Sequence, residues 1–314
     1  MKCTIIYFSQ TGNTEKIARA IQKGVAQEAG PCDIVRIKDA DPRRLYQYDL
    51  IGLGFPVIGF VEPLNVQAFI RKMRYVGGKH AFVFDTHGTR HEFVFPSVVP
   101  KLRRKNMTVI GMYDCYASVG GQENCPTGGH PDEIDLKEAE AFGRQTAERS
   151  RRIFAGEANL IPSYPEYVEY HVNKFITERQ AREKELGMPA PVAERRSMLE
   201  YDRRKCRYPK CRLCMDNCPM EGIDLSMDPP EVGKPCMRCM TCVSVCPTDA
   251  MSMARPGGDG PPNMGGTAWE AVFQEFYMAP LAKAEAEGRF RRLVPIDKVN
   301  HGGGLGPRKK KPNQ

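Results

Sequence analysis

Eight of the twelve cysteines of the chain stand in two short runs between residues 206 and 247. Each run ends in Cys-Pro, and together the runs comprise Cys206, Cys211, Cys214, Cys218, Cys236, Cys239, Cys242 and Cys246. The second run has the spacing C-x2-C-x2-C-x3-C-P, which presents thiolates to cubane iron–sulfur clusters. A short loop can wrap only three of the four iron corners of a cube, so the fourth thiolate comes from elsewhere in the chain. The runs therefore predict two [4Fe–4S] clusters within one small core.

The second run resembles that of the bacterial two-cluster ferredoxins, in which the cysteine before proline binds the other cluster. The resemblance implies two ligand sets, namely Cys206, Cys211, Cys214 and Cys246 for one cluster and Cys236, Cys239, Cys242 and Cys218 for the other. The first run departs from the pattern, because Arg207–Lys210 separates its first two cysteines where the pattern has two residues. We expect this insertion to bulge, and a [3Fe–4S] cluster or an altered potential stays open for that site.

Zinc binding and disulfide bonding are the alternatives for so many cysteines. Structural zinc sites usually show two CxxC pairs, not CxxCxxC with a closing Cys-Pro. Disulfides need an oxidising compartment, and the N-terminus lacks the basic segment and apolar segment of a secretory signal. We therefore expect a cytoplasmic protein, active without oxygen, that uses its thiolates for clusters.

A second candidate site follows the first expected strand, which spans residues 2–8. The segment reads Ser9-Gln10-Thr11-Gly12-Asn13-Thr14, and residues 15–28 after it have the apolar periodicity of a helix. Hydroxyl groups and backbone N–H groups at a helix N-terminus bind phosphate, and the helix dipole favours its negative charge. The segment is neither a Walker loop nor a G-x-G-x-x-G motif, so it predicts a different kind of phosphate site.

This segment resembles the Ser/Thr-x-Thr-Gly-x-Thr phosphate loop of flavodoxins, with matches at Ser9, Thr11, Gly12 and Thr14. With the cysteine runs behind it, the chain resembles the flavodoxin–ferredoxin fusion family of electron-transfer proteins. The resemblance implies an FMN-binding domain over residues 1–155 and a two-cluster ferredoxin domain over residues 201–252. The alternative is a flavodoxin-like domain that keeps the turn without the nucleotide, because a fold does not guarantee a site.

Strand and helix patterns alternate through the first 155 residues. We expect strands at residues 2–8, 33–38, 48–54, 80–86 and 108–113, and helices at 15–28, 63–75, 93–105 and 131–154. This alternation is typical of an α/β fold with a doubly wound, five-stranded parallel sheet. The resemblance implies the flavodoxin strand order 2-1-3-4-5, together with a small α+β ferredoxin-like domain for the two clusters.

Two further loops follow the third and fourth expected strands, where such sheets bind ligands. By resemblance these loops flank the isoalloxazine ring of FMN, and the residues concerned are Phe55, Pro56, Val57, Gly59, Phe60, Thr86, His87 and Gly88. Phe55, Phe60 and His87 are the candidates for ring contact, and Gly59 is the candidate for the flexible peptide near flavin N5. Flavodoxins often place Trp or Tyr against the ring, and neither occurs in these loops. The alternative for the two phenylalanines is ordinary core packing.

Other residues with reactive side chains give weaker signals. His87 and His91 stand four residues apart, but without a third ligand in view we interpret the spacing as coincidence. No basic partner or helix terminus is evident for the remaining cysteines, so we expect passive thiols at Cys3, Cys32, Cys115 and Cys125. The glycine-rich stretch 120–129 is typical of a surface loop, and the alternative is a loop that lies over the flavin or faces the ferredoxin domain.

The rest of the chain is a linker at residues 156–200 and an extension at 253–314. Helical patterns occur at 167–184 and 269–284, and a basic run, 308–311, contributes to the net charge of +8. We expect the chain after residue 284 to be disordered alone and ordered only on a partner. Its charge suits docking to an acidic partner protein, and a solvated tail is the alternative. No nucleic-acid recognition module is present, and no apolar run approaches the roughly 18 residues of a membrane span.

The predicted function is electron transfer, in which low-potential electrons pass between FMN and two [4Fe–4S] clusters to a partner redox enzyme. No set of catalytic acid, base and nucleophile stands out, so no substrate pocket is assigned. One alternative is a flavin-dependent reductase of a small molecule, with the clusters as internal wiring. Another is a dedicated electron-donating or activating subunit of a larger anaerobic complex.

Overall fold

The computed structural model describes residues 1–119, 124–164, 169–187, 199–253 and 267–299. The chain divides into two compact units. The first comprises Met1–Gln180 together with Gln274–Asn300, and the second is built on Ala181–Phe273. Within the described residues, no helix combines the length and the apolar character needed to cross a bilayer. The predicted C-terminal basic run lies outside the described residues.

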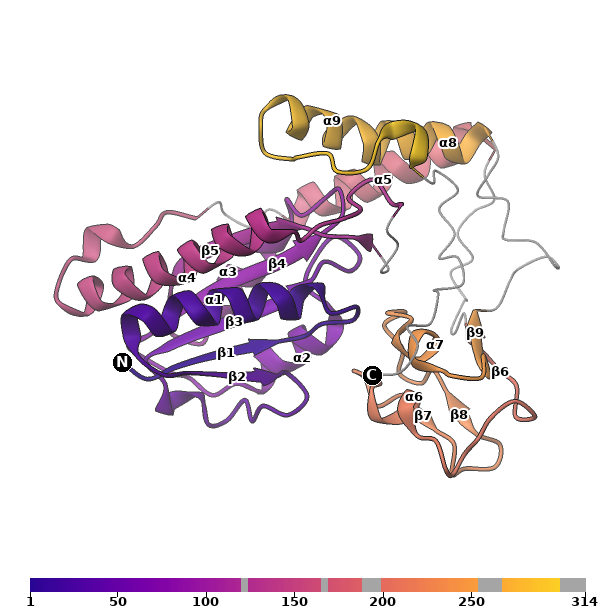
Figure 1. Cartoon of the computed structure of the whole chain (residues 1–314), viewed down its shortest axis with the longest axis horizontal. Helices are drawn as coiled ribbons and strands as arrows, with labels where there is room; N and C mark the ends of the chain where they lie inside the picture. The colour runs from indigo at the N-terminus through magenta and orange to yellow at the C-terminus, as the bar shows by residue number, and fades with distance from the viewer. Residues whose placement is uncertain (120–123, 165–168, 188–198, 254–266, 300–314) are drawn as a thin grey trace. The chain divides into compact units, whose positions relative to one another are not determined.

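The first unit is built on a five-stranded parallel sheet (Figure 1). Its strands are β1 (Cys3–Tyr7), β2 (Cys32–Arg36), β3 (Leu50–Pro56), β4 (Lys79–His87) and β5 (Met107–Tyr116). Their spatial order is β2-β1-β3-β4-β5, so the predicted flavodoxin order is confirmed. All the strands are parallel, and their carboxyl ends therefore meet at one edge of the sheet.

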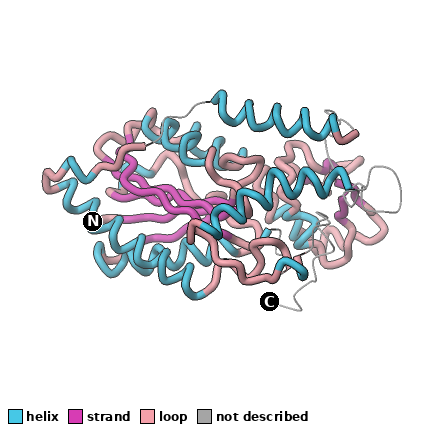
Figure 2. The backbone as a smooth tube through the Cα atoms, turned by 90° about the horizontal axis from the view of Figure 1, so that it is seen from above, coloured by secondary structure: helices cyan, strands magenta, loops and turns pink. Residues whose placement is uncertain are grey.

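Helices cover both faces of this sheet, as Figure 2 shows with the strands in magenta and the helices in cyan. Helices α1 (Asn13–Ala29) and α4 (Glu133–Phe154) pack against each other. Ile17, Ile21 and Val25 form the fully buried stripe of α1, because their spacing puts them on one helix face. Helices α2 (Leu64–Lys72) and α3 (Val94–Arg103) cover the other face, where Phe69 and Leu102 meet side chains of β1, β3 and β4.

Glycine sets how closely α1 and α4 approach each other. A Cβ atom built on Gly143 of α4 would lie 2.2 Å from the carbonyl oxygen of Ile21 in α1. No real side chain tolerates that distance, so only glycine allows the two backbones this contact. The α1 helix is thereby held firmly, and its N-terminus stays fixed at the carboxyl edge of the sheet.

The extension belongs to the first unit from Gln274 to the last described residue, 299. It begins with α8 (Thr267–Phe273), which is part of the second unit. It continues in the first unit as a π-helical turn η4 (Gln274–Met278), α9 (Ala279–Ala286) and a short turn η5 (Ile296–Lys298). Leu281, Ala284 and Phe290 are buried together, and Tyr116 at the end of β5 packs against them. The expectation of disorder after residue 284 is therefore wrong for the described residues up to 299, because their apolar side chains have a partner surface on the sheet.

The remaining turns and the linker helix connect these elements. The turns are η1 (Leu45–Gln47) and η3 (Ala158–Leu160), and the linker helix is α5 (Glu169–Glu185), close to its predicted span of 167–184. Phe175 of α5 is buried, and its ring contacts the first unit. The linker helix thus contributes its early part to the packing of that unit.

The second unit is small and held by little regular structure. Its strands pair antiparallel as β6 (Leu199–Tyr201) with β9 (Met251–Met253) and as β7 (Ile223–Asp224) with β8 (Glu231–Val232). Each cysteine run contains one short helix, α6 (Leu213–Asp216) in the first and α7 (Thr241–Val245) in the second. The buried core consists of three cysteines together with Ile223, Leu225, Ala250 and Met251. An apolar core this small depends on additional bonds for its stability.

Candidate functional site

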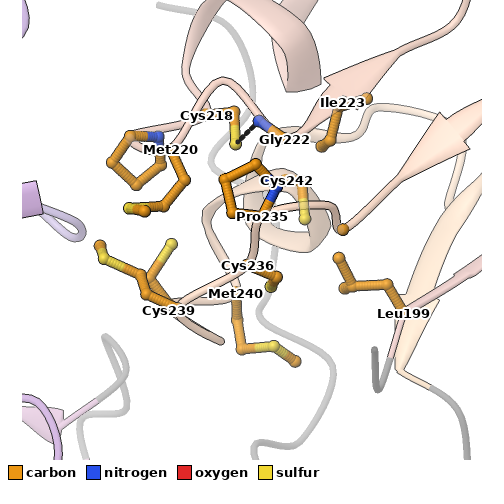
Figure 3. Close-up of a pocket in the computed structure, with 13 residues that line it drawn as sticks. Leu199, Cys218, Met220, Gly222, Ile223, Pro235, Cys236, Cys239, Met240 and Cys242 are labelled. Carbon is orange, nitrogen blue, oxygen red and sulfur yellow. Dashed lines mark hydrogen bonds between the residues drawn. The ribbon is translucent and has the colours of Figure 1, made fainter. Parts of the chain in front are cut away.

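Four cysteines from both runs line one pocket of the second unit (Figure 3). They are Cys218 from the first run and Cys236, Cys239 and Cys242 from the second. Leu199 and Ile223 contribute apolar walls to the same pocket. These are the four residues that the sequence resemblance grouped together. The pocket offers four sulfur donors in an apolar setting, which suits an iron–sulfur cube.

Backbone conformation in the second run turns its cysteines toward this pocket. Arg238 and Met240, which flank Cys239, have φ values of 58° and 60°. Such left-handed residues are uncommon outside glycine and wrap the chain tightly. The backbone N–H of Arg238 donates to Cys236 Sγ at 3.3 Å, and the N–H of Gly222 donates to Cys218 Sγ at 3.3 Å, the dashed line in Figure 3. N–H groups aimed at sulfur stabilise thiolate charge and tune cluster potential.

The other four cysteines line a second pocket. They are Cys206, Cys211 and Cys214 from the first run and Cys246 from the second. The inserted segment between Cys206 and Cys211 folds as an exposed turn, closed by a hydrogen bond from the Cys211 N–H to the Arg207 carbonyl at 3.1 Å. The Tyr208 N–H donates to Cys206 Sγ at 3.4 Å. The insertion bulges outward and leaves its flanking cysteines on the pocket.

The backbone makes the same left-handed turn after the Cys-Pro of each run. Glu221 and Asp249 each stand three residues after the last cysteine of their run, and both have a φ of 53°. The next residue is Gly222 in the first run and Ala250 in the second. A Cβ atom on Gly222 would lie 1.8 Å from the carbonyl oxygen of Pro235, so this position requires glycine. The sequence carried this internal repeat, which the spacing of the cysteines alone did not reveal.

The free thiols in these pockets lie in two kinds of environment. Burial raises the pKa of Cys242 to about 12 and that of Cys214 to about 11. For Cys246 burial also acts to raise the pKa, but N–H donors of Thr248, Met251 and Ala250 outweigh it and lower the pKa. Within the described residues all eight thiols are free of disulfide bonds. Buried thiols of raised pKa bind a metal only with release of their protons, which a multivalent cluster drives.

The predicted phosphate loop lies between β1 and α1. Gly12 has a φ of 93° and its N–H donates to Ser9 Oγ at 3.1 Å, which shapes the turn. Asn13 Nδ2 donates to the carbonyl of Ser118 at 3.1 Å. Thr11 is exposed, whereas the hydroxyl of Thr14 is buried and lies 2.7 Å from that of Thr86. The loop therefore keeps the hydroxyl of Thr11 and the first N–H groups of α1 available for an anion.

The loop after β3 contains the turn in which we expect the flexible flavin peptide. Ile58 and Val61 pair as an isolated bridge around Gly59 and Phe60, whose φ values are 65° and 73°. The N–H of Val57 donates to the Thr86 carbonyl at 2.9 Å and ties this loop to the loop after β4. Gly59 is exposed, so the Gly59–Phe60 peptide is accessible to a ligand at the sheet edge.

The side chain of Phe60 contacts other elements of its own unit. Its ring packs edge-on to that of Phe175 in α5, with centroids 4.8 Å apart. Phe175 also contacts Phe276 of η4, with centroids 5.8 Å apart, and the Arg90 guanidinium lies 4.4 Å from its ring centroid. The Arg90 Nε–H donates to the Phe276 carbonyl at 2.7 Å. The early part of α5 and the returning extension thus pack against the loops expected to flank the flavin.

Two of the proposed ring contacts have buried side chains. Phe55 is fully buried on β3, so it has no face free for a flavin, and we no longer propose it as a ring contact. His87 is 2% exposed, and its ring lies between those of His91 and Tyr116, at centroid distances of 4.4 and 4.5 Å. The neighbouring His91 is influenced by two carboxylates. Burial acts to lower the pKa of His91, but Asp85 and Asp114 outweigh this effect and raise the pKa to about 9. Pro56, the last residue of β3, and Gly88, directly after β4, are half-buried at the edge.

The cysteines outside the two runs are buried thiols. Burial raises the pKa of Cys3 to about 11 and that of Cys32 to about 12, and it raises the pKa of Cys115 further still. A thiol with a raised pKa is a poor nucleophile, because little thiolate is present at neutral pH. This chemistry agrees with the interpretation of these residues as passive.

Comparison with known proteins identifies both parts of the chain. The family described as Flavodoxin domain matches residues 4–117, and the family described as 4Fe-4S binding domain matches residues 235–252. The ferredoxin of Methanothermococcus thermolithotrophicus is 44% identical over 57 residues, which are 18% of this chain and 92% of that protein. The flavodoxin of Clostridium beijerinckii is 30% identical over 87 residues, which are 27% of this chain and 63% of that protein.

Solved structures also align with part of the chain. The structure of a flavodoxin from the domain Archaea is 21% identical, covers 48% of this chain and 99% of that chain, and has a TM-score of 0.39. The two-electron reduced flavodoxin of Megasphaera elsdenii is 23% identical, covers 46% of this chain and 98% of that chain, and has a TM-score of 0.37.

Proposed function

Because this chain belongs to the ferredoxin family through its cysteine-rich unit and carries a flavodoxin domain ahead of it, we propose a specific electron-transfer role. The protein holds FMN and two [4Fe–4S] clusters and passes low-potential electrons to a partner redox enzyme. The observation that carries the proposal is the division of eight cysteines into two pockets of four, with Cys218 and Cys246 each joining the other run.

The ligand sets follow from these pockets. Cys218, Cys236, Cys239 and Cys242 hold one cluster, and Cys206, Cys211, Cys214 and Cys246 hold the other. The crossed ligands tie the two runs together, so each cluster also supports the fold of the other run. The N–H groups aimed at Cys218, Cys236 and Cys206 stabilise their negative charge and adjust the potential of each cluster.

The flavin site is proposed at the carboxyl edge of the sheet. Ser9, Thr11 and the N-terminus of α1 bind the FMN phosphate, because they combine hydroxyl donors with the positive end of a helix dipole. The Gly59–Phe60 peptide lies at the ring edge. FMN, when bound, exchanges one or two electrons, whereas each cluster exchanges one. The protein's own contribution is to bind, orient and shield these groups.

The carrier role is favoured over reduction of a small substrate by the packing around Phe60. Phe175, Phe276 and Arg90 fill the space beside this loop with the chain's own side chains. A reductase needs an open flavin face beside a substrate pocket, whereas a carrier needs only an exposed ring edge. Steady turnover of a small quinone by the purified protein, without a partner, would contradict the carrier role.

Selective loss of each cofactor tests the assignment of the sites. Thr11→Ala removes an exposed hydroxyl at the phosphate loop, and we expect weaker FMN retention with iron content unchanged. Cys239→Ala should lower the iron content by up to one cluster and leave the flavin in place. Cys115→Ala is the matched control, because Cys115 is a buried thiol outside both pockets. Unchanged flavin in the first variant, or unchanged iron in the second, would count against the respective site.

A further inference from the structure

Four ionisable side chains outside the proposed electron-transfer ligand sets meet at the carboxyl ends of β4 and β5. The parallel register pairs Asp85 of β4 with Asp114 of β5. His87 lies two residues after Asp85, on the same face of the strand. The following loop brings His91 back, so that its ring stacks on that of His87 with centroids 4.4 Å apart and planes 18° apart. Two carboxylates and two imidazoles therefore share one small volume.

The nitrogen and oxygen atoms of this cluster converge. His87 Nε2 lies 3.3 Å and His91 Nε2 lies 3.5 Å from the same oxygen, Oδ2 of Asp114. His91 Nδ1 lies 3.8 Å from Asp85 Oδ2, which is longer than a hydrogen bond. One ligand atom each from Asp85, His87 and His91 lies within 4.8 Å of the others. This is the third ligand that the spacing of His87 and His91 alone did not provide.

The burial of the Asp85 carboxylate is the observation that indicates a bound cation. Its side chain is fully inaccessible, and neither carboxylate oxygen has a hydrogen-bond donor among the described residues. His91 Nδ1 likewise has none among them. A buried carboxylate without donors is strongly unfavourable, which is why such groups are paired or coordinate metals. Asp85 therefore needs a positively charged partner, and the His91 ring, at 3.8 Å, is a basic group beside it that a bound metal ion would bridge to the carboxylate.

The orientation of His87 fits coordination as well. Its Nδ1 lies 3.1 Å from the Gly88 carbonyl, which can accept the Nδ1–H, and its Nε2, 3.3 Å from Asp114 Oδ2, is the nitrogen that would meet a cation. Metal-binding histidines usually donate their second N–H to a carbonyl or carboxylate in this way. Once His91 gives up its proton to a bound metal, the two carboxylates balance the charge of one divalent cation.

We propose that Asp85, His87, His91 and Asp114 form a binding site for a divalent transition metal of the zinc and ferrous iron class. Two imidazoles with carboxylates are the donor set that such ions prefer. An ion about 2.0–2.1 Å from each donor brings tetrahedral ligand atoms to about 3.4 Å from one another. The cluster contracts by a movement of His91, which lies in a loop and has a side chain 24% exposed.

A second group of this kind, His130 with Asp132 and Asp135, is already neutralised by the chain itself. Arg291 donates to Asp132 at 2.7 and 2.9 Å and to Asp135 at 2.9 Å. The guanidinium occupies the place that a cation would take. This group therefore supplies an internal control with the same residue types and no free coordination position.

Zinc binding to the protein loaded with flavin and iron tests the proposal independently of electron transfer. The protein and its variants are dialysed against chelator without oxygen, checked for unchanged iron, and titrated with Zn²⁺ alone. We expect about one zinc per chain for the unmodified protein and for His130→Gln. We expect affinity weaker by about tenfold or more for His91→Gln and Asp85→Asn. If Asp85→Asn does not fold, the exposed position of His91 makes His91→Gln decisive.

X-ray absorption at the zinc edge separates this site from the cysteines. We expect nitrogen and oxygen neighbours at about 2.0–2.1 Å and no sulfur shell at about 2.3 Å. Equal zinc affinity in His91→Gln and the unmodified protein would overturn the proposal, as would a sulfur shell or the absence of zinc binding. Since iron and flavin contents are measured separately, loss of either would bear on the electron-transfer role and not on the metal site.

Discussion

At the scale of single residues, the cysteine pockets depend on one glycine, Gly222. Gly222 follows the left-handed Glu221 and lies against the Pro235 carbonyl, where a Cβ atom would be 1.8 Å from oxygen. Backbone has to move to admit even a methyl group. Because Gly222 also donates its N–H to Cys218, that movement displaces a proposed cluster ligand.

We predict that Gly222→Ala lowers the iron content by about one cluster per chain and destabilises the cysteine-rich unit. The matched control is Ala250→Gly, because Ala250 occupies the equivalent place in the other run and loses a methyl group instead of gaining one. Iron analysis and thermal unfolding measure both variants. Full iron content in Gly222→Ala would show that the pocket tolerates backbone movement that we consider prohibitive.

The sequence predicts single residues well where the chemistry demands a particular atom. The two ligand sets that the resemblance implies are the same two groups of cysteines that line the two pockets. Burial of Phe55 and His87 is not evident from the sequence, because an aromatic side chain in a loop can face either the ligand or the core. The convergence of Asp85 and Asp114 depends on the register between β4 and β5, which local patterns do not encode.

At the scale of elements, the returning extension is fastened to the start of α4. His130 is buried, and its Nδ1 lies 2.6 Å from Asp135 Oδ2 while its Nε2 lies 2.7 Å from the Arg291 carbonyl. Asp132 caps α4 and accepts two hydrogen bonds from Arg291. Both ring nitrogens of His130 face acceptors, so the imidazolium form makes both hydrogen bonds at once.

This contact makes stability depend on pH. Burial acts to lower the pKa of His130, but the acceptors Asp135 and the Arg291 carbonyl outweigh it, and the pKa is raised. A raised folded pKa means that the stabilisation is complete below the unfolded value of about 6.5 and is lost as pH rises through the folded pKa. We therefore expect the unmodified protein to exceed His130→Gln in stability by about 1–2 kcal/mol at pH 6.

Thermal unfolding of the two proteins between pH 6 and pH 9 measures this difference. We expect the gap between their midpoints to shrink as pH rises, since the imidazolium hydrogen bonds are lost only from the unmodified protein. His80→Gln is the control. Burial lowers the pKa of His80, so the contribution of His80 to stability does not fall as pH rises. A gap that stays constant with pH would mean that His130 acts as a neutral ring.

The sequence predicts regular elements where apolar periodicity is strong. Five strands and the helices between them are placed correctly to within a few residues, as for α5 at Glu169–Glu185. The packing of residues 285–299 is missed, because their arginines suggest a solvated segment. In the structure Arg291 and Arg292 form ion pairs within the first unit, with Asp132 and Glu285.

At the scale of the whole molecule, the first of the two units is formed by two separate stretches of the chain. The first unit takes residues from both ends of the described chain. The sequence predicts two cofactor domains, because each carries a motif with a definite chemical purpose. It does not predict that a segment after the cysteine-rich unit completes the first unit, since this depends on a surface formed only by folding.

Two truncations distinguish packing from docking in the extension. Removal of residues 300–314 should leave thermal stability and flavin content unchanged, because it retains the buried Leu281 and Phe290. Removal of residues 274–314 should destabilise the first unit by several kcal/mol, since Phe276, Leu281 and Phe290 are lost from its buried core. Equal stability of the two truncated proteins would contradict the packing described for the extension. Partner binding belongs to residues 300–314 only if the shorter truncation abolishes it.

The central claim is that one chain holds a flavin and two iron–sulfur clusters as an electron-transfer protein. An EPR-monitored redox titration of protein purified without oxygen, with flavin and iron quantified in the same sample, tests it most directly. We predict one FMN and about eight iron atoms per chain, with two interacting [4Fe–4S] signals on full reduction. A preparation that binds zinc instead of iron, or that shows one cluster and no flavin, would contradict the account.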